Sequence, residues 1–555
     1  MTNRKPYLHY LGLAGAIALG AVLRFWNLGL KPLWMDEVIT AIFSLGKNYH
    51  DLPLNVLFPL QRVPELFTYQ SGVSCDQIAE NLANQSTHPP LFFCVMYSWL
   101  GRMTPLGSEW VVKLRSLSAL FGVGAIAAIY GVNRIAFYPA SGIIAALIMA
   151  ISPFAVYLSQ EARHYTMPMF LITLALLGVI QIQQEILEKK RIRLWVVILW
   201  SIVNIIGLYV HYFFILAFIA EVITLLIFIY FTKSQILNKH QIYLSLILSI
   251  TGVVISFIPW LRVMLNHFQS AETHWLPATM HIAPIYQTLI SWILMVIALP
   301  VENQPLLITV ICGFFMVSFA IWLGWQVSKG LKLLLLENTT HLATLTLLTF
   351  TIVVLIQFFA IAYLLGKDIT IVPRYSFVYY PSFCALLAAS ISKNNKSKLI
   401  ILLVGMLSCI FVVSNLIFQK PFQPEQVAQN MNLDPSVPIM LVVGYNNYQD
   451  VALGLSFALA LEKVRSNKNA AVPVSVKNSD SLVFLDKSLH SSAFWNKLDQ
   501  ISTPATSQMN LWIVGPGMIK RDYPQQLDLY GDGVCTIDKT QHYRIGIPYQ
   551  LYRCK

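Results

Sequence analysis

The sequence predicts a polytopic α-helical membrane protein that ends in a small α/β domain. Its composition, the length of its apolar runs and the more polar tail after residue 420 all support this fold class. Of the 555 residues, 56% are hydrophobic and 12% are charged, whereas soluble domains carry about 25% charged residues. A soluble fold of this length could not bury so much apolar surface, but a bilayer accommodates it in runs of about 20 residues.

Apolar runs long enough to span a bilayer predict about 11 transmembrane helices. They cover residues 8–24, 112–132, 140–157, 164–182, 195–210, 212–231, 242–262, 304–325, 342–365, 376–391 and 399–417. Two shorter or interrupted stretches, 89–100 and 285–299, are expected to form helices at the membrane surface. The first run ends in Arg24, Phe25 and Trp26, where a signal peptide would have a small-residue cleavage site, so we interpret it as an anchor.

Lys and Arg in the short loops predict the orientation, because these residues favour the cytoplasmic side. A cytoplasmic N-terminus puts on the inside Arg4, Lys5, Arg134, Lys189, Lys190, Arg191, Arg193, Lys233, Lys239, Lys329, Lys332, Lys393, Lys396 and Lys398. The stretch 263–302 then lies outside and contains neither Lys nor Arg. The net charge of +12 is thereby explained without a nucleic-acid partner, and we expect an integral membrane protein with an extracytoplasmic C-terminus; the family resemblance described below implies a bacterial inner or plasma membrane.

Four parts are expected along the chain. Residues 1–24 form the first transmembrane helix, 25–111 the first extracytoplasmic loop with surface helices, and 112–417 the transmembrane body. Residues 420–555 have ordinary soluble composition and are expected to form an extracytoplasmic α/β accessory domain.

The tail contains strand-like runs and one run with helical periodicity. The expected strands are 438–443, 482–485, 511–514, 534–538 and 543–553, and the expected helix is 449–464. Cys535 and Cys554 fall in the last two strands, on the side predicted to be oxidising, and are candidates for a disulfide.

The first candidate for chemistry is the acidic pair Asp36 and Glu37 in the first outer loop. Trp26 and Trp34 flank the pair, as aromatic residues do at a membrane interface. Solvated loop carboxylates are the simplest interpretation. A carboxylate held beside an apolar wall is also suited to act as a general base.

Two further polar motifs lie in outer segments. In Thr87-His88-Pro89-Pro90, the prolines predict an extended entry into a helix and restrict the direction of His88, which is either incidental or a donor to an anion. Residues 159–165 place several polar groups in a short turn between two spans. Two interpretations are open there. Glu161 and Arg163 form an ion pair with each other, or Arg163 binds a phosphate while Glu161 orients an acceptor or a metal.

The last motif is Pro373-Arg374-Tyr375, at the outer start of the tenth predicted span. The guanidinium geometry of Arg374 suits an anionic head group, although a side chain extending to the interface is the simpler alternative. His211, between two closely linked spans, is interpreted as a packed interfacial residue.

The order of these motifs resembles that of a known group. Asp-Glu in the first outer loop, then His-Pro-Pro, then Gln-Glu-Ala-Arg-x-Tyr, then Arg-Tyr in a late loop are similar to the membrane-embedded GT-C glycosyltransferases of the protein-mannosyltransferase and lipid A aminoarabinose-transferase type. The resemblance covers residues 20–170 and, more loosely, 360–390. The tail resembles no family.

The resemblance implies a polyprenyl-phosphate sugar as donor and reaction at the outer face of the bilayer, in cell-envelope glycosylation. It assigns the catalytic position to Asp36, with Glu37 beside it. It also implies phosphate contacts by Arg163, Arg374 and Tyr375, and cavity positions for His88, Glu161 and Tyr165. The chain lacks the large inserted outer domain of eukaryotic protein mannosyltransferases, which weakens the case for a protein acceptor and leaves glycan, lipid and protein acceptors open.

The chemistry of such a transfer needs little acid assistance, because lipid phosphate is a good leaving group. In-line displacement would invert the anomeric carbon, with Asp36 deprotonating the acceptor and the arginines stabilising the departing phosphate. No cofactor is required, and a divalent metal at Asp36 and Glu161 is compatible with the sequence.

Three alternatives stay open. A membrane transporter would place ionisable residues near the middle of the membrane and show internal repeats. A polysaccharide polymerase or ligase would also use lipid-linked sugars, with its key residues in large late loops. A non-enzymatic scaffold would tolerate replacement of the loop charges.

Overall fold

The structure is a computed structural model that describes residues 6–103, 110–232, 238–268, 277, 281–466, 479–487, 491–501, 508–529 and 533–555. Arg4, Lys5, Lys233 and part of the stretch 263–302 lie outside these residues. The chain divides into two compact units, and neither is continuous in sequence. The first comprises 1–28, 82–96 and 112–418, and the second comprises 29–81, 97–111 and 419–555.

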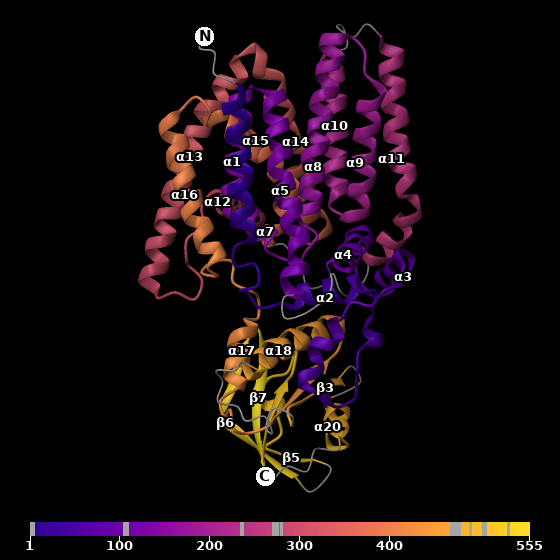
Figure 1. The fold of residues 1–555 in the computed structure, drawn as a ribbon, viewed down its shortest axis with the longest axis vertical. Helices are drawn as coiled ribbons and strands as arrows, with labels where there is room; N and C mark the ends of the chain where they lie inside the picture. The colour runs from indigo at the N-terminus through magenta and orange to yellow at the C-terminus, as the bar shows by residue number, and fades with distance from the viewer. Residues whose placement is uncertain are drawn as a thin grey trace. The chain divides into compact units, whose positions relative to one another are not determined.

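The first unit is a helical membrane domain (Figure 1). In the described part of the chain, eight helices are long and apolar enough to cross a membrane. They are α1 (Pro6–Phe25), α5 (Trp110–Ala136), α8 (Thr166–Gln184), α10 (Phe214–Thr232), α11 (Lys239–Phe268), α13 (Leu306–Leu336), α14 (Asn338–Leu365) and α16 (Asn395–Val413). Shorter apolar helices are α9 (Leu194–Val210), α12 (Ala283–Val296) and α15 (Tyr380–Ile391). The predicted fold class, a polytopic helical membrane protein with a C-terminal α/β domain, is confirmed.

The run predicted as one span at 140–157 is two helices, α6 (Pro139–Ile151) and α7 (Pro153–Ser159), bent by 58°. The cause is Pro153, which disfavours helical backbone at the preceding residue, and Ser152 is accordingly extended and caps α7. The buried guanidinium of Arg24 donates to the carbonyl oxygens of Met149 and Ala150 at 2.9 and 3.0 Å. These carbonyls belong to the last turn of α6, so Arg24 satisfies acceptors that the bend leaves without helical donors.

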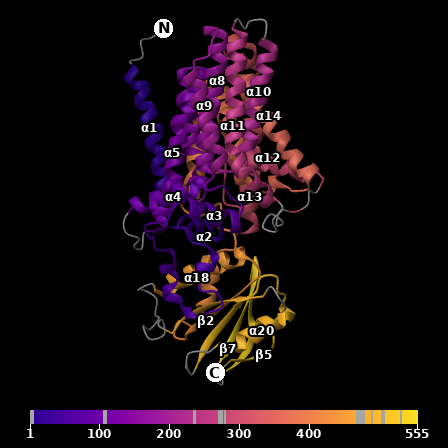
Figure 2. The ribbon, with the colours of Figure 1, turned by 90° about the vertical axis from the view of Figure 1, so that its right-hand side faces the viewer.

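Helices of the first unit lie side by side in both views (Figures 1 and 2). Helix α9 packs between α8 and α11, and α10 packs against α14. The connections between α7 and α8 and between α9 and α10 are short. They therefore hold polar residues close to the ends of packed helices.

The second unit contains a seven-stranded sheet in the order β1-β3-β2-β4-β7-β6-β5. Its strands are β1 (Phe58–Pro59), β2 (Ile439–Tyr445), β3 (Ser481–Asp486), β4 (Met509–Val514), β5 (Gln526–Leu529), β6 (Gly533–Ile545) and β7 (Ile547–Cys554). β2 pairs in parallel with β3 and β4, and the other neighbouring pairs are antiparallel. β1 comes from the segment expected to be the first loop, and its pairing with β3 builds that segment into the sheet.

Helices α17 (Pro424–Met431) and α18 (Tyr448–Ser466) complete this unit, and α18 packs on β2. The strand predicted at 543–553 is instead the end of β6, a tight turn at Gly546 and β7. Gly546 has a φ of +73°, a conformation that glycine adopts without a Cβ penalty. The turn brings Ile545 opposite Ile547 and so sets the register of the hairpin.

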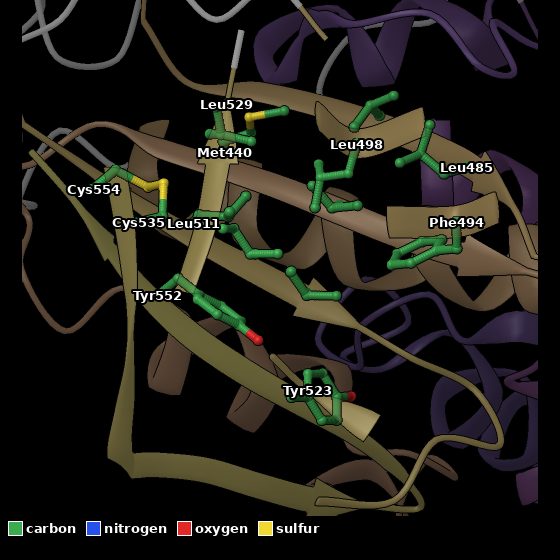
Figure 3. Packing of buried hydrophobic residues seen from close by; sticks show 14 of the residues in the cluster. Met440, Leu485, Phe494, Leu498, Leu511, Tyr523, Leu529, Cys535, Tyr552 and Cys554 are labelled. Carbon is green, nitrogen blue, oxygen red and sulfur yellow. A yellow bond between two sulfur atoms is a disulfide. The ribbon is translucent and has the colours of Figure 1, made fainter. Parts of the chain in front are cut away.

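The core of the sheet unit is apolar and closed at one end by a disulfide (Figure 3). Cys535 and Cys554 face each other across β6 and β7 and are joined by a bond of 2.00 Å. Buried Arg465 on α18 donates to both carboxylate oxygens of Asp480, which in turn accepts from the backbone N–H of Ile439. This ion pair therefore fixes the start of β2 against the end of α18.

Candidate functional site

The turn between α7 and α8 is buried, although most of its residues are polar. Gln160, Glu161, Arg163 and His164 are each no more than 3% exposed. The Gln160 side chain donates to the backbone carbonyls of Leu23 and Trp26, at the C-terminal end of α1. Ser118 of α5 donates to the carbonyl of Arg163 at 2.8 Å. Contacts with two other helices thus hold the turn in one conformation.

Tyr165, at the end of this turn, contacts both arginines of the predicted site. Arg374 Nε donates to the Tyr165 hydroxyl at 3.1 Å. The guanidinium carbons of Arg163 and Arg374 lie 5.6 and 5.9 Å from the centre of the Tyr165 ring, within cation–π range. Arg374 is 209 positions from Tyr165 in the sequence, yet its guanidinium approaches the same ring as that of Arg163.

Arg374 and Tyr375 lie in the short 3₁₀ helix η6 (Pro373–Val378). The Tyr375 ring is 4.8 Å from Phe213 and 6.3 Å from Tyr165. Glu161 is 1% exposed, and Tyr157 of α7 has both Glu161 and Arg374 as electrostatic neighbours. The predicted residues of the first unit thus gather around Tyr165.

Three histidines complete this cluster. The ring of His164 lies 5.0 Å from that of His88 and 4.5 Å from that of His211. Arg163 Nη2 is 3.2 Å from His88 Nε2, which links the first histidine to the arginine. Of these three, the sequence pattern predicted only His88 as a site residue, and His211 was expected to be a packed interfacial residue. A signal was present, because His164 and His211 both occupy short turns between consecutive apolar runs.

The imidazoles are held neutral by their surroundings. Burial, followed by the charge of Arg163, lowers the pKa of His211 to about 3. Burial, then His211 and then Arg163, holds the pKa of His164 well below its usual range. Desolvation and Arg163 act in the same direction on the pKa of His88. The cluster therefore combines two permanent cations with three neutral hydrogen-bonding rings, an arrangement suited to binding an anion. We call these residues, Arg163, Arg374, Tyr165, His88, His164 and His211, the Arg–His cluster.

The acidic pair belongs to the second unit and begins a helix rather than lying in a loop. Asp36 and Glu37 occupy the first turn of α2 (Met35–Ser44), where the helix dipole favours carboxylates. Glu37 is fully buried and forms an ion pair of 3.5 Å with Lys420. Lys420 also lies 5.8 Å from the centre of the Trp34 ring. Asp36 is 9% exposed, compared with 0% for Glu37.

No group of three or more His, Cys, Asp or Glu side chains within the described ranges is arranged to hold a metal ion. Asp36 belongs to the second unit and Glu161 to the first, and each is described with the residues of its own unit.

Comparison with solved structures identifies the architecture. The apo structure of ArnT from Cupriavidus metallidurans is 10% identical in sequence, with a TM-score of 0.52 over 92% of this chain and 93% of that protein. ArnT bound to undecaprenyl phosphate gives a TM-score of 0.49 at 10% identity, over 92% of this chain and 94% of that protein. An oligosaccharyltransferase from Archaeoglobus fulgidus, tethered with an acceptor peptide, gives 0.46 at 12% identity.

The alignment with the oligosaccharyltransferase covers 82% of this chain but only 63% of the archaeal protein. No family model and no curated protein matches the sequence. The conclusion on the fold rests on apo ArnT, which has the highest TM-score of the three and is aligned over nearly its whole length. The chain has the fold of the GT-C glycosyltransferases.

Proposed function

We propose that this protein is a glycosyltransferase that takes a sugar from a polyprenyl-phosphate donor and transfers it to an extracytoplasmic acceptor. The observation that carries the proposal is the Arg–His cluster. Two guanidiniums and three neutral imidazoles converge around Tyr165. A GT-C fold with such a cluster at the ends of its helices is suited to hold a lipid phosphate.

The donor phosphate is assigned to Arg163 and Arg374. A guanidinium binds phosphate through two parallel N–H groups and keeps its charge at all relevant pH values. Arg374 Nε donates to the Tyr165 hydroxyl, and this hydrogen bond orients the guanidinium for the proposed phosphate contact. Tyr375 packs beside Tyr165 and Arg374 and limits the positions that the phosphate can take.

Asp36 is assigned as the general base. Glu37 is ion-paired with Lys420 and is therefore assigned to positioning the first turn of α2 rather than to proton transfer. Breaking such a buried pair would leave a charge uncompensated. Asp36 is 9% exposed and Glu37 is fully buried, and this difference supports the division of roles.

In the proposed reaction, an acceptor hydroxyl oxygen bonds to the anomeric carbon while the bond from that carbon to the phosphate oxygen breaks. The proton of the hydroxyl passes to Asp36, and the phosphate keeps the electron pair, so the anomeric configuration is inverted. General-base assistance contributes about 10²–10⁴-fold, and fixed cations stabilise the charge that develops on the phosphate.

Positive loops inside and a disulfide in the second unit support an extracytoplasmic active site. Disulfides persist in oxidising compartments, and Cys535–Cys554 is one such bond. The expected acceptors are glycans, lipids or proteins on that side of the membrane. The apolar helices establish an integral membrane protein, and the orientation is part of the proposal.

The test is transfer of radiolabelled sugar from a panel of polyprenyl-phosphate donors in purified membranes. Wild type is compared with Asp36→Asn and with Asp76→Asn, an exposed carboxylate in the same unit. We expect transfer by wild type and Asp76→Asn, and loss of about 10²-fold or more in Asp36→Asn. Equal transfer by all three would remove Asp36 as the base. Absence of transfer with every donor would contradict the proposed activity and favour the transporter.

A further inference from the structure

The ring nitrogens of the histidines in the Arg–His cluster have different partners. A neutral imidazole carries hydrogen on one nitrogen and accepts at the other, whereas an imidazolium donates from both. The partner of each nitrogen therefore shows whether the ring can take a second proton without losing a hydrogen bond.

His88 is fixed in its neutral form. A guanidinium only donates, so Arg163 Nη2 donates to His88 Nε2 at 3.2 Å. The hydrogen of His88 must then lie on Nδ1, which donates to Ser86 Oγ at 2.8 Å. A second proton on Nε2 would place an N–H of His88 against an N–H of Arg163, and the hydrogen bond between them would be lost.

His211 and the nearby His267 are fixed in the same way. The backbone N–H of Phe213 donates to His211 Nδ1 at 2.9 Å, so protonation of that nitrogen would break the bond. His267 Nε2 donates to the carbonyl of Ala83 at 3.1 Å, and its Nδ1 accepts from the Tyr212 hydroxyl at 2.8 Å. Both rings keep one donor and one acceptor only while they are neutral.

His164 differs from these three. It is 1% exposed, and its Nδ1 has no hydrogen-bond partner in the part of the chain that the structure describes. A buried ring nitrogen without a partner costs free energy, and a bound ligand oxygen would remove that cost. The charged and titratable groups around it are Arg163, Arg374, His88, His211 and Tyr165, with Glu161 in the same turn and His267 beyond His88.

We propose that His164 takes up a proton when the product, a polyprenyl monophosphate, binds, and that its Nδ1–H then donates to a phosphate oxygen. This inference rests on the proposed function and identifies His164 as the residue that distinguishes product from donor. The donor is a phosphodiester with one negative charge, and the product is a phosphomonoester that reaches two. An imidazolium at His164 supplies one positive charge where the product carries one additional negative charge.

Binding of the product is therefore coupled to pH. The monoester binds more tightly as the pH falls and is released more readily as the pH rises, whereas binding of the diester depends little on pH. The proton comes from solvent and returns to it on release, so the cycle is balanced.

The experiment is calorimetric titration of the purified protein with farnesyl monophosphate and with methyl farnesyl phosphate, a diester. Titrations at pH 7.5 in HEPES and in Tris give the number of protons taken up, because these buffers differ in ionisation enthalpy. The free monoester is almost fully dianionic at this pH, since its second pKa is about 6. The variants are His164→Asn and His164→Gln, with His341→Asn, an exposed histidine, as the matched control. Inorganic phosphate tests whether the lipid is required.

We expect uptake of about 0.5–1 proton for each farnesyl monophosphate bound by wild type and His341→Asn, and almost none for the diester. His164 variants should lose the uptake and bind the monoester about tenfold more weakly or worse, with a smaller loss of affinity for the diester. Monoester binding by wild type without proton uptake, or equal uptake in folded His164 variants, would overturn the inference and leave the proposed function standing. Failure of wild type to bind either lipid would overturn both.

Discussion

Two buried polar regions of the first unit differ in where their partners come from. In the spanning helices, fully buried Glu221 of α10 accepts from Trp200 Nε1 at 2.8 Å and from Asn204 Nδ2 at 3.1 Å, both on α9. All three residues belong to one pair of adjacent helices and no cation takes part in these bonds. The Arg–His cluster instead draws on segments near residues 88, 163, 211 and 374 and includes two guanidiniums.

This difference distinguishes a structural polar contact from the proposed ligand site. Glu221 with its two donors links α9 to α10, and neutral N–H groups supply its contacts. The Arg–His cluster brings together charges from distant segments. Such an arrangement costs free energy near a membrane, and its presence therefore indicates a function. We therefore expect changes at Glu221 to affect stability and changes in the Arg–His cluster to affect turnover.

The largest expected effect is on turnover, from Arg163→Gln and Arg374→Gln. Each removes a fixed cation from the departing phosphate, and loss of one such donor costs about 10²–10³-fold in rate. The measurement is sugar transfer per folded molecule, with Lys329→Gln, an exposed basic residue, as the control for overall charge. Transfer by either arginine variant at the wild-type rate would place the phosphate elsewhere.

The converse prediction concerns Glu221. Alanine would leave the N–H groups of Trp200 and Asn204 without their acceptor, at a cost of about 1–3 kcal/mol for each group, whereas glutamine keeps an acceptor oxygen. Thermal unfolding in detergent should therefore show a clear loss for Glu221→Ala and a small one for Glu221→Gln. Transfer per folded molecule should be unchanged in both. A turnover defect in stable Glu221→Gln would show that Glu221 contributes to the reaction and not only to stability.

The pH dependence of stability sharpens the comparison. The pKa values of His164 and His211 are lowered in the folded protein, so below about pH 6.5 the unfolded chain binds more protons than the native state. Stability should fall as the pH drops from about 6.5, by up to about 1.4 kcal/mol per pH unit for each histidine. Unfolding temperatures at pH 7.5 and 5 should show this loss, and His164→Asn should reduce it. An equal loss in wild type and variant would exclude His164 as a contributor.

The smallest expected effect is that of Tyr165→Phe. The aromatic ring remains beside both guanidiniums, and only the hydroxyl that accepts from Arg374 is lost. Such a hydrogen bond contributes about 1 kcal/mol, or roughly a fivefold decrease in transfer. Tyr165→Leu, which also removes the ring, should lose more. Equal rates for the two variants would show that the ring contributes nothing.

The sequence predicted the helices well because each is encoded by its own apolar run. Pro153 was visible, yet the run 140–157 was predicted as one span, and the bend became clear only from the extended backbone of Ser152. β1 has two residues and exists only through its pairing with β3. A strand that short has no local pattern from which it could be predicted.

The candidate site was predictable in part. The charges of Arg163 and Arg374 stand out in apolar surroundings, and their order along the chain suggested one site. The roles of His164 and His211 depend on contacts with distant segments, such as the 5.0 Å approach of His88. Likewise, Glu37 forms its ion pair with Lys420, which lies far along the chain. Those contacts depend on tertiary packing, which cannot be predicted from a local sequence pattern.

The most direct test of the central claim is an experimental structure of the protein with a prenyl phosphate bound. The account predicts the phosphate between the guanidiniums of Arg163 and Arg374, with His164 Nδ1 within hydrogen-bonding distance of one of its oxygens. Phosphate density away from both arginines, in a structure that shows the lipid well ordered, would contradict the assignment of the Arg–His cluster as the donor site.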